Sequence, residues 1–473
     1  MKVDTIIKAP HFFTMAGEGV GYRSGAALVV DRGRIVDLAE AAAVDGRYQA
    51  EETLALDHHA VLPGLIDAHM HLGLCIMRGL AQDVRNWMME GIHPFEAVAS
   101  RKDHELGARL AMMETIQAGT TTLGEWGGDL DGTCAEFARL GVRGNVTQII
   151  REVERRAYGP GELYLFNPDL GRTYLQRNLE LFDRWHGKAD GRIRILFGPQ
   201  AADFVGRELL LETRRLAKER NALIHMHVQQ GDRETHQTLG RYGQRPIAWL
   251  KEIGYLDESL IAVHLTDADD QEAAVVARSG ASMVACVSAI TVIDGIVPPF
   301  PAFQAAGGRC GLGSDQAAGN NNHNMFNEMK LACLMGKVRQ RDPEVMPCWR
   351  ALRMATIEGA QAIGLGDLIG SLEVGKRADF IAVDLTRPTM LPVFTGPMRN
   401  IVPNLVYSAR GGEVALSVVD GRTIMKDGRV LGLDQDQLVA ELAVSAGELG
   451  GRAGEAFRKI HGPNAKFMEE GKL

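Results

Sequence analysis

The chain has 473 residues, of which 45% are hydrophobic and 24% charged, and its formal net charge is −8. This length can bury a sizeable core, and the negative charge disfavours nucleic acid or an anionic membrane as the main partner, since both attract basic surfaces. Asp4 and Lys8 interrupt the apolar core that a signal peptide would need, and no stretch reaches the roughly 18 apolar residues of a membrane-spanning helix. We therefore expect a cytoplasmic protein that acts on a small molecule.

The first sixty residues have the pattern of short β-strands. Apolar runs at 4–15, 25–39 and 52–64 are separated by glycines and charged turns, which is typical of hairpins. The same pattern of short apolar runs separated by glycines and charged residues occurs again at 370–385 and 414–431. Because these two groups lie near opposite ends of the chain, we expect them to pair into one small, separate β-sandwich.

Between these two groups, strand-like apolar runs alternate with longer amphipathic stretches. This alternation predicts βα units and a parallel sheet. Eight such runs occur, at 62–72, 120–126, 143–150, 192–199, 222–228, 260–267, 281–289 and 309–315. Eight βα units of this size predict an α/β fold with a single (β/α)8 (TIM) barrel.

The resulting organisation has four parts. Residues 1–60 and 366–430 form the N-terminal and C-terminal parts of the β-sandwich, and residues 61–365 form the barrel. Residues 431–473 form a C-terminal helical extension, expected as one or two exposed helices. None of the six cysteines forms a CxxC pair, so neither a disulfide framework nor a thiolate metal site is expected.

Polar residues stand at the ends of the predicted barrel strands. His69 and His71 close the first strand, His227 the fifth and His264 the sixth, while Asp315 closes the eighth. The carboxyl ends of barrel strands converge on one mouth, where active sites are built. Imidazoles and a carboxylate that meet there predict a site for a divalent metal of the zinc type.

Two of these strands carry the pattern HxH. Residues i and i+2 of a strand share a face, so His69 and His71 can reach one ion at roughly 2.0–2.1 Å. His225 and His227 in "ALIHMHV" raise the same possibility. We expect His227 to be the ligand, because the terminal position reaches further into the mouth. His225 is then expected to be a supporting residue of the site, although His225 could bind the metal instead.

Six segments carry a resemblance to a known family. They are "VLPGLIDAHMH", "QAGTTTLGEW", "HMHVQQ", "AVHLTD", "GLGSD" and "EVGKRADFIAVDL", and together they span most of the chain. The chain resembles the amidohydrolase superfamily, in particular its branch of aminohydrolases and triazine hydrolases such as the atrazine chlorohydrolases. It also resembles the phenylurea and molinate hydrolases of that superfamily.

The resemblance implies a barrel with a composite β-sandwich, a homo-oligomer, and one divalent metal ion per subunit. The implied ligands are His69, His71, His227 and Asp315, with His264 near the metal, where it orients water or polarises the substrate. Zinc is the expected metal, with cobalt, iron or manganese as alternatives. Binuclear relatives bridge two ions with a carboxylated lysine at the end of strand four, and here that strand ends in "LFGPQ" without a lysine.

The chain departs from the family at Gln230. The aminohydrolases have a glutamate three residues after the strand-five ligand, and that carboxyl protonates a ring nitrogen of the substrate. An amide cannot exchange a proton in this way. A carbonyl substrate would not need that proton, so Gln230 would bind substrate N–H or C=O groups while Asp315 carries the proton from water to the leaving nitrogen.

The sequence therefore predicts a metal-dependent hydrolase that cleaves a carbonyl C–N bond in a urea, carbamate or amide, including phenylurea or thiocarbamate xenobiotics. One alternative is a deaminase of an N-heterocycle such as a triazine, pyrimidine or purine. A second alternative is a non-catalytic, metal-binding barrel.

Further residues at the strand ends are candidates for the substrate pocket. The expected substrate contacts, besides Gln230, are Trp87, Glu125, Trp126 and Arg151. Whether His236 and His323, in loops after strands five and eight, reach the site is left open by the sequence.

Overall fold

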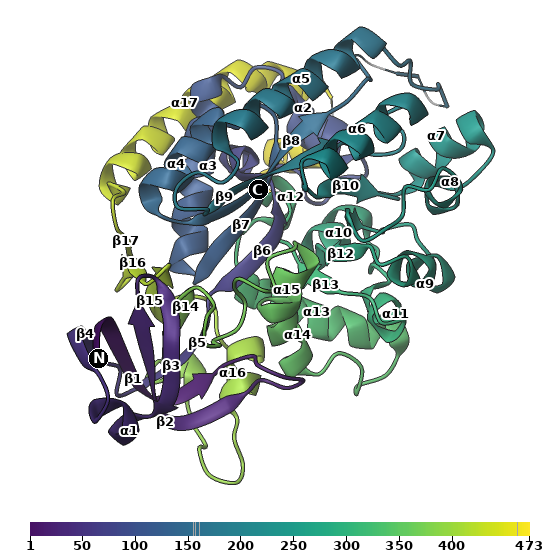
Figure 1. The fold of residues 1–473 in the computed structure, drawn as a ribbon. Coiled ribbons are helices and arrows are strands. Elements are labelled where there is room, and N and C mark those ends of the chain that lie inside the picture. Colours follow the sequence, from purple (N-terminus) through teal and green to yellow (C-terminus); the bar gives the residue numbers. More distant parts are fainter. Residues whose placement is uncertain (155, 157, 160, 461) are drawn as a thin grey trace.

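The computed structural model describes residues 1–473 except 155, 157, 160 and 461, and its strands form two sheets (Figure 1). The larger body is a barrel of eight parallel strands, and the second sheet comes from both ends of the chain. Among the described residues, no helix combines the length and the apolar character that crossing a membrane requires.

The first sheet has nine strands in the order β17-β16-β15-β14-β5-β1-β2-β3, with β4 paired to β1. The strands are β1 (Lys2–Phe13), β2 (Tyr22–Asp31), β3 (Arg34–Glu40), β4 (Gln49–Ala55), β5 (His59–Pro63), β14 (Phe380–Asp384), β15 (Val414–Val419), β16 (Arg422–Lys426) and β17 (Arg429–Val430). The junction of the two chain ends is the antiparallel pair β5–β14. One apolar cluster contains residues of β1, β2, β14 and β15, so the predicted union of the two groups is confirmed.

The barrel strands follow one another in chain order. They are β6 (Leu65–Met70), β7 (Thr120–Gly127), β8 (Arg143–Ile150), β9 (Ile193–Pro199), β10 (Ile224–Val228), β11 (Leu260–His264), β12 (Ser282–Ala285) and β13 (Cys310–Leu312). A parallel bridge between Met70 and Asp315 joins the last strand region to the first. The predicted α/β barrel is therefore confirmed, with one refinement: residues 287–294 form a helix, where the sequence suggested a continuing strand.

Helices cover the outside of the barrel. They are α3 (Arg101–Gln117), α4 (Asp131–Leu140), α5 (Pro168–Trp185), α6 (Arg207–Glu219), α7 (Asp232–Tyr242), α8 (Pro246–Glu252), α9 (Asp270–Arg278), α10 (Val287–Asp294), α11 (Phe300–Ala305), α13 (Met325–Gln340), α14 (Cys348–Met354) and α15 (Ile357–Ala362). Shorter elements lie in the connections: α1 (Ala41–Asp45), η1 (Leu72–Met77), η2 (Trp87–Ile92), α2 (His93–Glu96), α12 (Ala317–Asn320), η3 (Pro388–Met390) and α16 (Ile401–Tyr407).

The C-terminal extension forms two helices, α17 (Gln435–Lys459) and α18 (Pro463–Glu469). The expectation that this region is exposed is only partly met. Leu449, Ala453 and Phe457 of α17 are buried, and α17 packs against α2 and α3. Their spacing of four residues places these side chains on one face of the helix, as packing against a core requires.

A buried ion network joins the barrel to the nine-stranded sheet. Arg143, at the start of β8, donates two hydrogen bonds to Asp379 (2.8 and 3.0 Å) and one to Asp420 (2.8 Å). The side chains of Arg143, Asp379 and Asp420 are at most 6% exposed. Because Arg143 lies at the amino end of its strand, this sheet packs against the end of the barrel opposite the strand carboxyl ends.

We expect Arg143→Ala to lower the free energy of unfolding by about 3–5 kcal/mol, because it removes the closest cation from two buried carboxylates. Asp420 keeps only its longer contacts with Arg192 and Arg377, at 3.6 Å each. Chemical denaturation followed by circular dichroism measures the change. Arg215→Ala is the matched control: the Arg215–Glu219 pair is more than half exposed, and its loss should cost less than about 0.5 kcal/mol. Equal effects of the two substitutions would contradict this role of Arg143.

Candidate metal centre and active site

The closure of the barrel brings the first and last strands together at the predicted metal site. The backbone N–H of Asp315 donates to the carbonyl of His69 (2.9 Å), and that of His71 donates to the carbonyl of Asp315 (2.8 Å). The pairing of β6 with β7 is irregular between Asp67 and Met70. The backbone itself thus holds two histidines and the carboxylate at one point on the rim.

Two of the site residues have unusual backbone conformations. His264 has a φ of 76° and Asp315 a φ of 60°, both in the left-handed region. Residues other than glycine rarely adopt this region, and such strain persists only where the surrounding structure enforces it. His264 ends a barrel strand, and Asp315 follows one closely. The left-handed backbone therefore sets the direction of both side chains at the barrel mouth.

Each candidate ligand ring is oriented through its other nitrogen. His71 Nδ1 donates to the carbonyl of Trp126 (2.7 Å), and His227 Nδ1 donates to the carbonyl of Gln200 (2.9 Å). A carbonyl can only accept, so Nδ1 carries the proton in both rings and Nε2 keeps its lone pair. This is the arrangement that fixes metal-binding histidines in proteins.

His69 is held by another histidine. Its Nδ1 lies 3.0 Å from His225 Nε2, and His225 Nδ1 lies 2.8 Å from the Thr147 hydroxyl. In the tautomer that leaves His69 Nε2 free, His69 donates to His225, and His225 donates to Thr147. The structure thus places His225 behind His69, as a supporting residue between His69 and Thr147.

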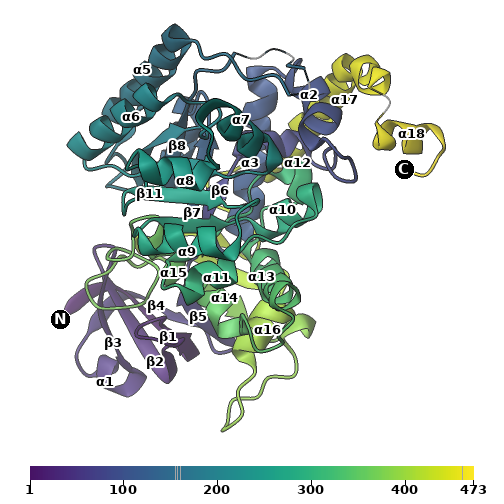
Figure 2. The same ribbon diagram turned by 90° about the vertical axis from the view of Figure 1, so that its right-hand side faces the viewer.

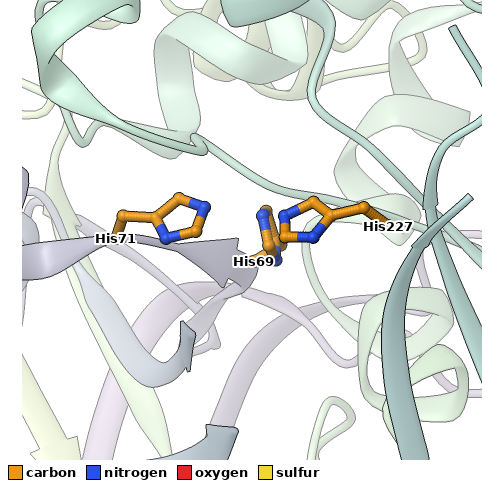
Figure 3. A group of neighbouring side chains, drawn as sticks. All are labelled: His69, His71 and His227. Atoms are coloured by element: carbon orange, nitrogen blue, oxygen red, sulfur yellow. The ribbon is translucent and has the colours of Figure 1, made fainter. Parts of the chain in front are cut away.

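The free ring nitrogens and the carboxylate converge. His69, His71 and His227 each have one potential ligand atom within 4.8 Å of the other two. The same holds for the group of His69, His264 and Asp315. Figure 3 shows the rings of His71 and His227 reaching toward His69 from opposite sides. Asp315 Oδ1 lies 3.3 Å from His71 Nε2 and 3.6 Å from His69 Nε2. Ligands at roughly 2.0–2.1 Å from a tetrahedral zinc would be about 3.4 Å apart.

Two buried histidines of the candidate metal site have ring nitrogens that make no hydrogen bond. Within the described part of the chain, His69 Nε2 and both ring nitrogens of His264 are buried without a hydrogen-bond partner. An unpaired buried polar atom is costly, and it is rare unless a ligand satisfies it. These observations, together with the neutral nitrogen and anionic oxygen donors, fit one divalent metal ion.

The electrostatics favour the same conclusion. Burial lowers the pKa of His69 to about 4 and that of His264 to about 3, so both rings are neutral at neutral pH. Burial alone would raise the pKa of Asp315, but its contacts with His69 and His71 hold that pKa well below the usual range. Neutral imidazoles and an ionised carboxylate are the forms that bind metal.

Of the predicted substrate contacts, the structure brings Trp126 to the histidines. Its ring centroid lies 4.5 Å from that of His227 and 5.3 Å from that of His71. The neighbouring Glu125 points to the other side of the strand, where its carboxylate accepts a hydrogen bond from the Leu72 backbone (2.9 Å). A direct substrate contact by Glu125 is therefore not supported by its position.

Gln230 stays partly accessible at the start of α7. Its backbone N–H donates to the buried carboxylate of Glu234 (2.8 Å), which fixes the turn after β10. Burial raises the pKa of Glu234 to about 8, and the negative charge of Asp203 adds to that shift. Glu234 is not among the residues predicted from the sequence. Its position four residues after Gln230 is the signal that could have identified it.

The remaining candidates are Arg151, Trp87 and His236. The guanidinium of Arg151 lies 6.0 Å from the ring centroids of both Tyr174 and Phe204, and Trp87 packs against the apolar cluster beneath α17. His236 is exposed on α7. Their predicted contacts with substrate remain predictions.

His323 is buried beside the loop that carries Asp315. Its Nδ1 lies 2.7 Å from the Ser314 hydroxyl, which also bonds to the carboxylate of Asp67. Asp67 stands two residues before His69, so this network links the first strand with the last. This position answers the question about His323 that the sequence left open. His323 contacts Ser314, the neighbour of Asp315, and so belongs to the residues that support the site.

Comparisons with known proteins agree with this site. The model of the amidohydrolase family matches residues 60–424. The 5′-deoxyadenosine deaminase of Methanosarcina barkeri is 30% identical over 449 residues, which cover 94% of this chain and 98% of that protein.

Two solved structures have the same fold. An adenosine deaminase from Xanthomonas campestris with bound zinc has a TM-score of 0.86 and 29% identity, covering 95% of this chain and 99% of that one. Atrazine chlorohydrolase TrzN from Arthrobacter aurescens, complexed with zinc, has a TM-score of 0.82 and 20% identity, covering 93% and 100%. The protein thus combines the barrel, the strand-end histidines and the aspartate with a family match over most of its length. The chain belongs to the amidohydrolase family, as a metal-dependent hydrolase of carbon–nitrogen bonds other than peptide bonds.

Proposed function

We propose that the protein hydrolytically deaminates an amino-substituted nitrogen heterocycle of the adenine nucleoside type. The observation that carries the proposal is the near full-length similarity to a 5′-deoxyadenosine deaminase, reinforced by the similarity to an adenosine deaminase structure. These comparisons favour deamination of an N-heterocycle, the first alternative from the sequence, over cleavage of a urea or carbamate.

Zinc is the proposed metal, with His69, His71, His227 and Asp315 as its ligands. The adenosine deaminase of similar fold contains zinc, and the nitrogen and oxygen donors of this chain suit that ion. A divalent ion in this position lowers the pKa of water to about 7 and so supplies hydroxide at neutral pH. The remaining chemistry belongs to the protein side chains.

Asp315 and His264 are the proposed proton-handling groups. As the water oxygen bonds to the amino-bearing ring carbon, Asp315 takes the water proton and His264 orients the attacking oxygen. The ring C=N electron pair moves to the ring nitrogen, which takes up a proton from a solvent water molecule. The C–N bond to the amino group then breaks as Asp315 delivers its proton to the departing ammonia, and the hydroxyl proton on the ring carbon returns to solvent, which leaves a carbonyl. The ring of Trp126 forms an apolar wall beside His71 and His227.

Gln230 favours a second candidate function. An amide cannot protonate a ring nitrogen, but it can bind a carbonyl or N–H group of a urea, carbamate or amide. That candidate needs only Asp315 to carry a proton. The cytoplasmic location and the homo-oligomeric state remain predictions from the sequence.

A substrate panel separates the two candidates. The zinc-loaded enzyme is incubated with adenosine, 5′-deoxyadenosine, an aminotriazine, a phenylurea and a carbamate, and both ammonia and organic amine are measured. The proposal expects ammonia from an aminoheterocycle as the fastest reaction. Faster release of amine from the phenylurea or carbamate would replace the proposal by the second candidate.

Gln230→Glu tests how deamination proceeds without the usual carboxylate. We expect the change to raise the rate of ammonia release by roughly 100-fold, the lower end of what a positioned acid contributes. It should weaken any reaction on a phenylurea, because the carboxylate loses the amide N–H donor. Steady-state rates on both substrates measure this.

His236→Glu is the matched control, since it adds the same charge at an exposed position of the adjoining helix. It should change neither rate. A slower deamination by Gln230→Glu would mean that the amide itself is needed for the reaction.

A further inference from the structure

The C-terminal helices contact the segment that follows the first metal-site strand. That segment runs over residues 78–98, after His71 and η1, and contains η2 and α2. One apolar cluster unites Met77, Ile92 and Phe95 with Leu449, Ala453 and Phe457 of α17. Figure 2 shows α17 beside α2, with α18 after it on the side of the molecule away from the nine-stranded sheet.

The same cluster reaches the loop that follows Asp315. Ala318 of α12 belongs to it, and the backbone N–H of Ala81 donates to the carbonyl of Ala318 (3.0 Å). The segment 78–98 therefore contacts the loop that follows the last barrel strand, close behind Asp315 in the chain. It also begins seven residues after His71, so both of its neighbours carry a residue of the metal centre.

Polar contacts fasten the two helices to this segment. Arg452 donates to the carbonyl of Val98 (3.2 Å) and to the carboxylate of Asp103 at the start of α3. Asn464, which is 3% exposed, donates to the carbonyl of Gln82 (2.8 Å). The rings of Phe457 and Phe95 pack with their centroids 5.4 Å apart. The contacts lie at both ends of the segment, so its middle, around Trp87, is held from both sides.

We propose that α17 and α18 clamp the segment 78–98 over the barrel mouth and thereby set which substituents of the substrate can enter. Phe457, Arg452 and Asn464 are positioning residues for this segment. The inference rests on the proposed function only in placing the substrate at the same metal centre. Loosening the clamp should change the fit of the part of the substrate that lies outside the reacting ring, and so affect KM more than kcat.

The experiment compares Phe457→Ala, Asn464→Ala and the double variant with the parent, all zinc-loaded. Two measurements are made: the rate of tryptic cleavage after Arg85, which is exposed within the segment, and KM and kcat for a small and a large substrate. The large one is an adenine nucleoside with a bulky 5′-thioether, and the small one is adenosine.

We expect cleavage after Arg85 to accelerate, and the KM ratio of large to small substrate to change by about tenfold in the double variant. Zinc content and kcat should stay within twofold. Phe457→Leu should restore most of the parent behaviour. Val444→Ala, on the exposed side of α17, is the matched control and should change nothing.

Unchanged cleavage in the double variant would overturn the clamp. Faster cleavage with an unchanged KM ratio would overturn its role in substrate selection. A loss of activity that appears as a lower kcat together with a lower zinc content would overturn that role as well. If the parent releases no ammonia from any heterocycle, the proposed function fails; the cleavage comparison still decides the clamp, and the KM comparison moves to two phenylureas of different size.

Discussion

His227→Ala is expected to strip the bound metal and to lower turnover by at least about a thousandfold, since hydroxide is no longer available at neutral pH. His227 contributes a ring whose Nδ1 is held by the carbonyl of Gln200, so Nε2 faces the other candidate ligands. Metal content by mass spectrometry after dialysis, and ammonia release by the same sample, measure the two effects.

Two further histidine variants provide a graded comparison. His225→Ala removes the group behind His69, and loss of such a supporting contact typically weakens metal binding by about 10- to 100-fold. Its activity should return at high zinc concentration, unlike that of His227→Ala. His236→Ala, on an exposed helix surface, should behave like the parent. Full metal content and parental turnover in His227→Ala would exclude His227 from the metal centre.

Asp315→Asn is expected to fold normally and to retain part of its metal, with turnover lowered by about 10³-fold or more, near the upper range for a general acid–base group. Asparagine tolerates the left-handed backbone that Asp315 adopts, so the substitution adds little strain. Its amide oxygen can still face the ion, but it cannot carry a proton from water to the leaving group.

Glu125→Gln and Asp294→Asn are the comparisons for Asp315→Asn. Glu125 is buried on the other side of β7, and Asp294 lies at the end of α10, where burial first and the charge of Asp315 second raise its pKa to about 6. Neither change should lower turnover more than a few-fold. If Asp315→Asn stays within a few-fold of the parent while Glu125→Gln loses activity, the base is Glu125 and the proposed proton path is wrong.

The amide at Gln230 is the main point at which family resemblance and chemistry disagree. The near full-length similarity favours deamination, whereas the amide removes the acid that deamination is expected to use. The structure adds a fixed turn: Glu234 accepts the Gln230 backbone N–H, so the Gln230 position is held in place. The substrate panel and Gln230→Glu together address this conflict.

Much of the fold could be predicted because its signals are local. Alternating apolar runs and amphipathic stretches follow from the periods of strands and helices, so each of the eight barrel strands lies in its predicted run to within one residue. The run at 281–289 extends past β12 into α10. The placement of His69, His71, His264 and Asp315 at strand ends needed only the chain order and the parallel arrangement of a barrel.

Side-chain direction could be predicted less well. Glu125 and Trp126 are neighbours at one strand end, yet only Trp126 faces the histidines. The pairing of β6 with β7 is irregular between Asp67 and Met70, and an irregular register shifts which side chains face inward. No property of the single strand reveals this, because the register depends on its neighbour.

The sequence by itself determined the barrel, the composite sheet and the set of residues gathered at the mouth. Only the tertiary structure decided which nitrogen of each histidine is free, that His225 lies behind His69, and that α17 packs over the segment 78–98. The same holds for Arg143, whose partners Asp379 and Asp420 lie more than 200 residues away. Periodicity is a property of neighbouring residues, whereas these contacts join residues far apart in the chain, and they exist only once the strands have closed into a barrel.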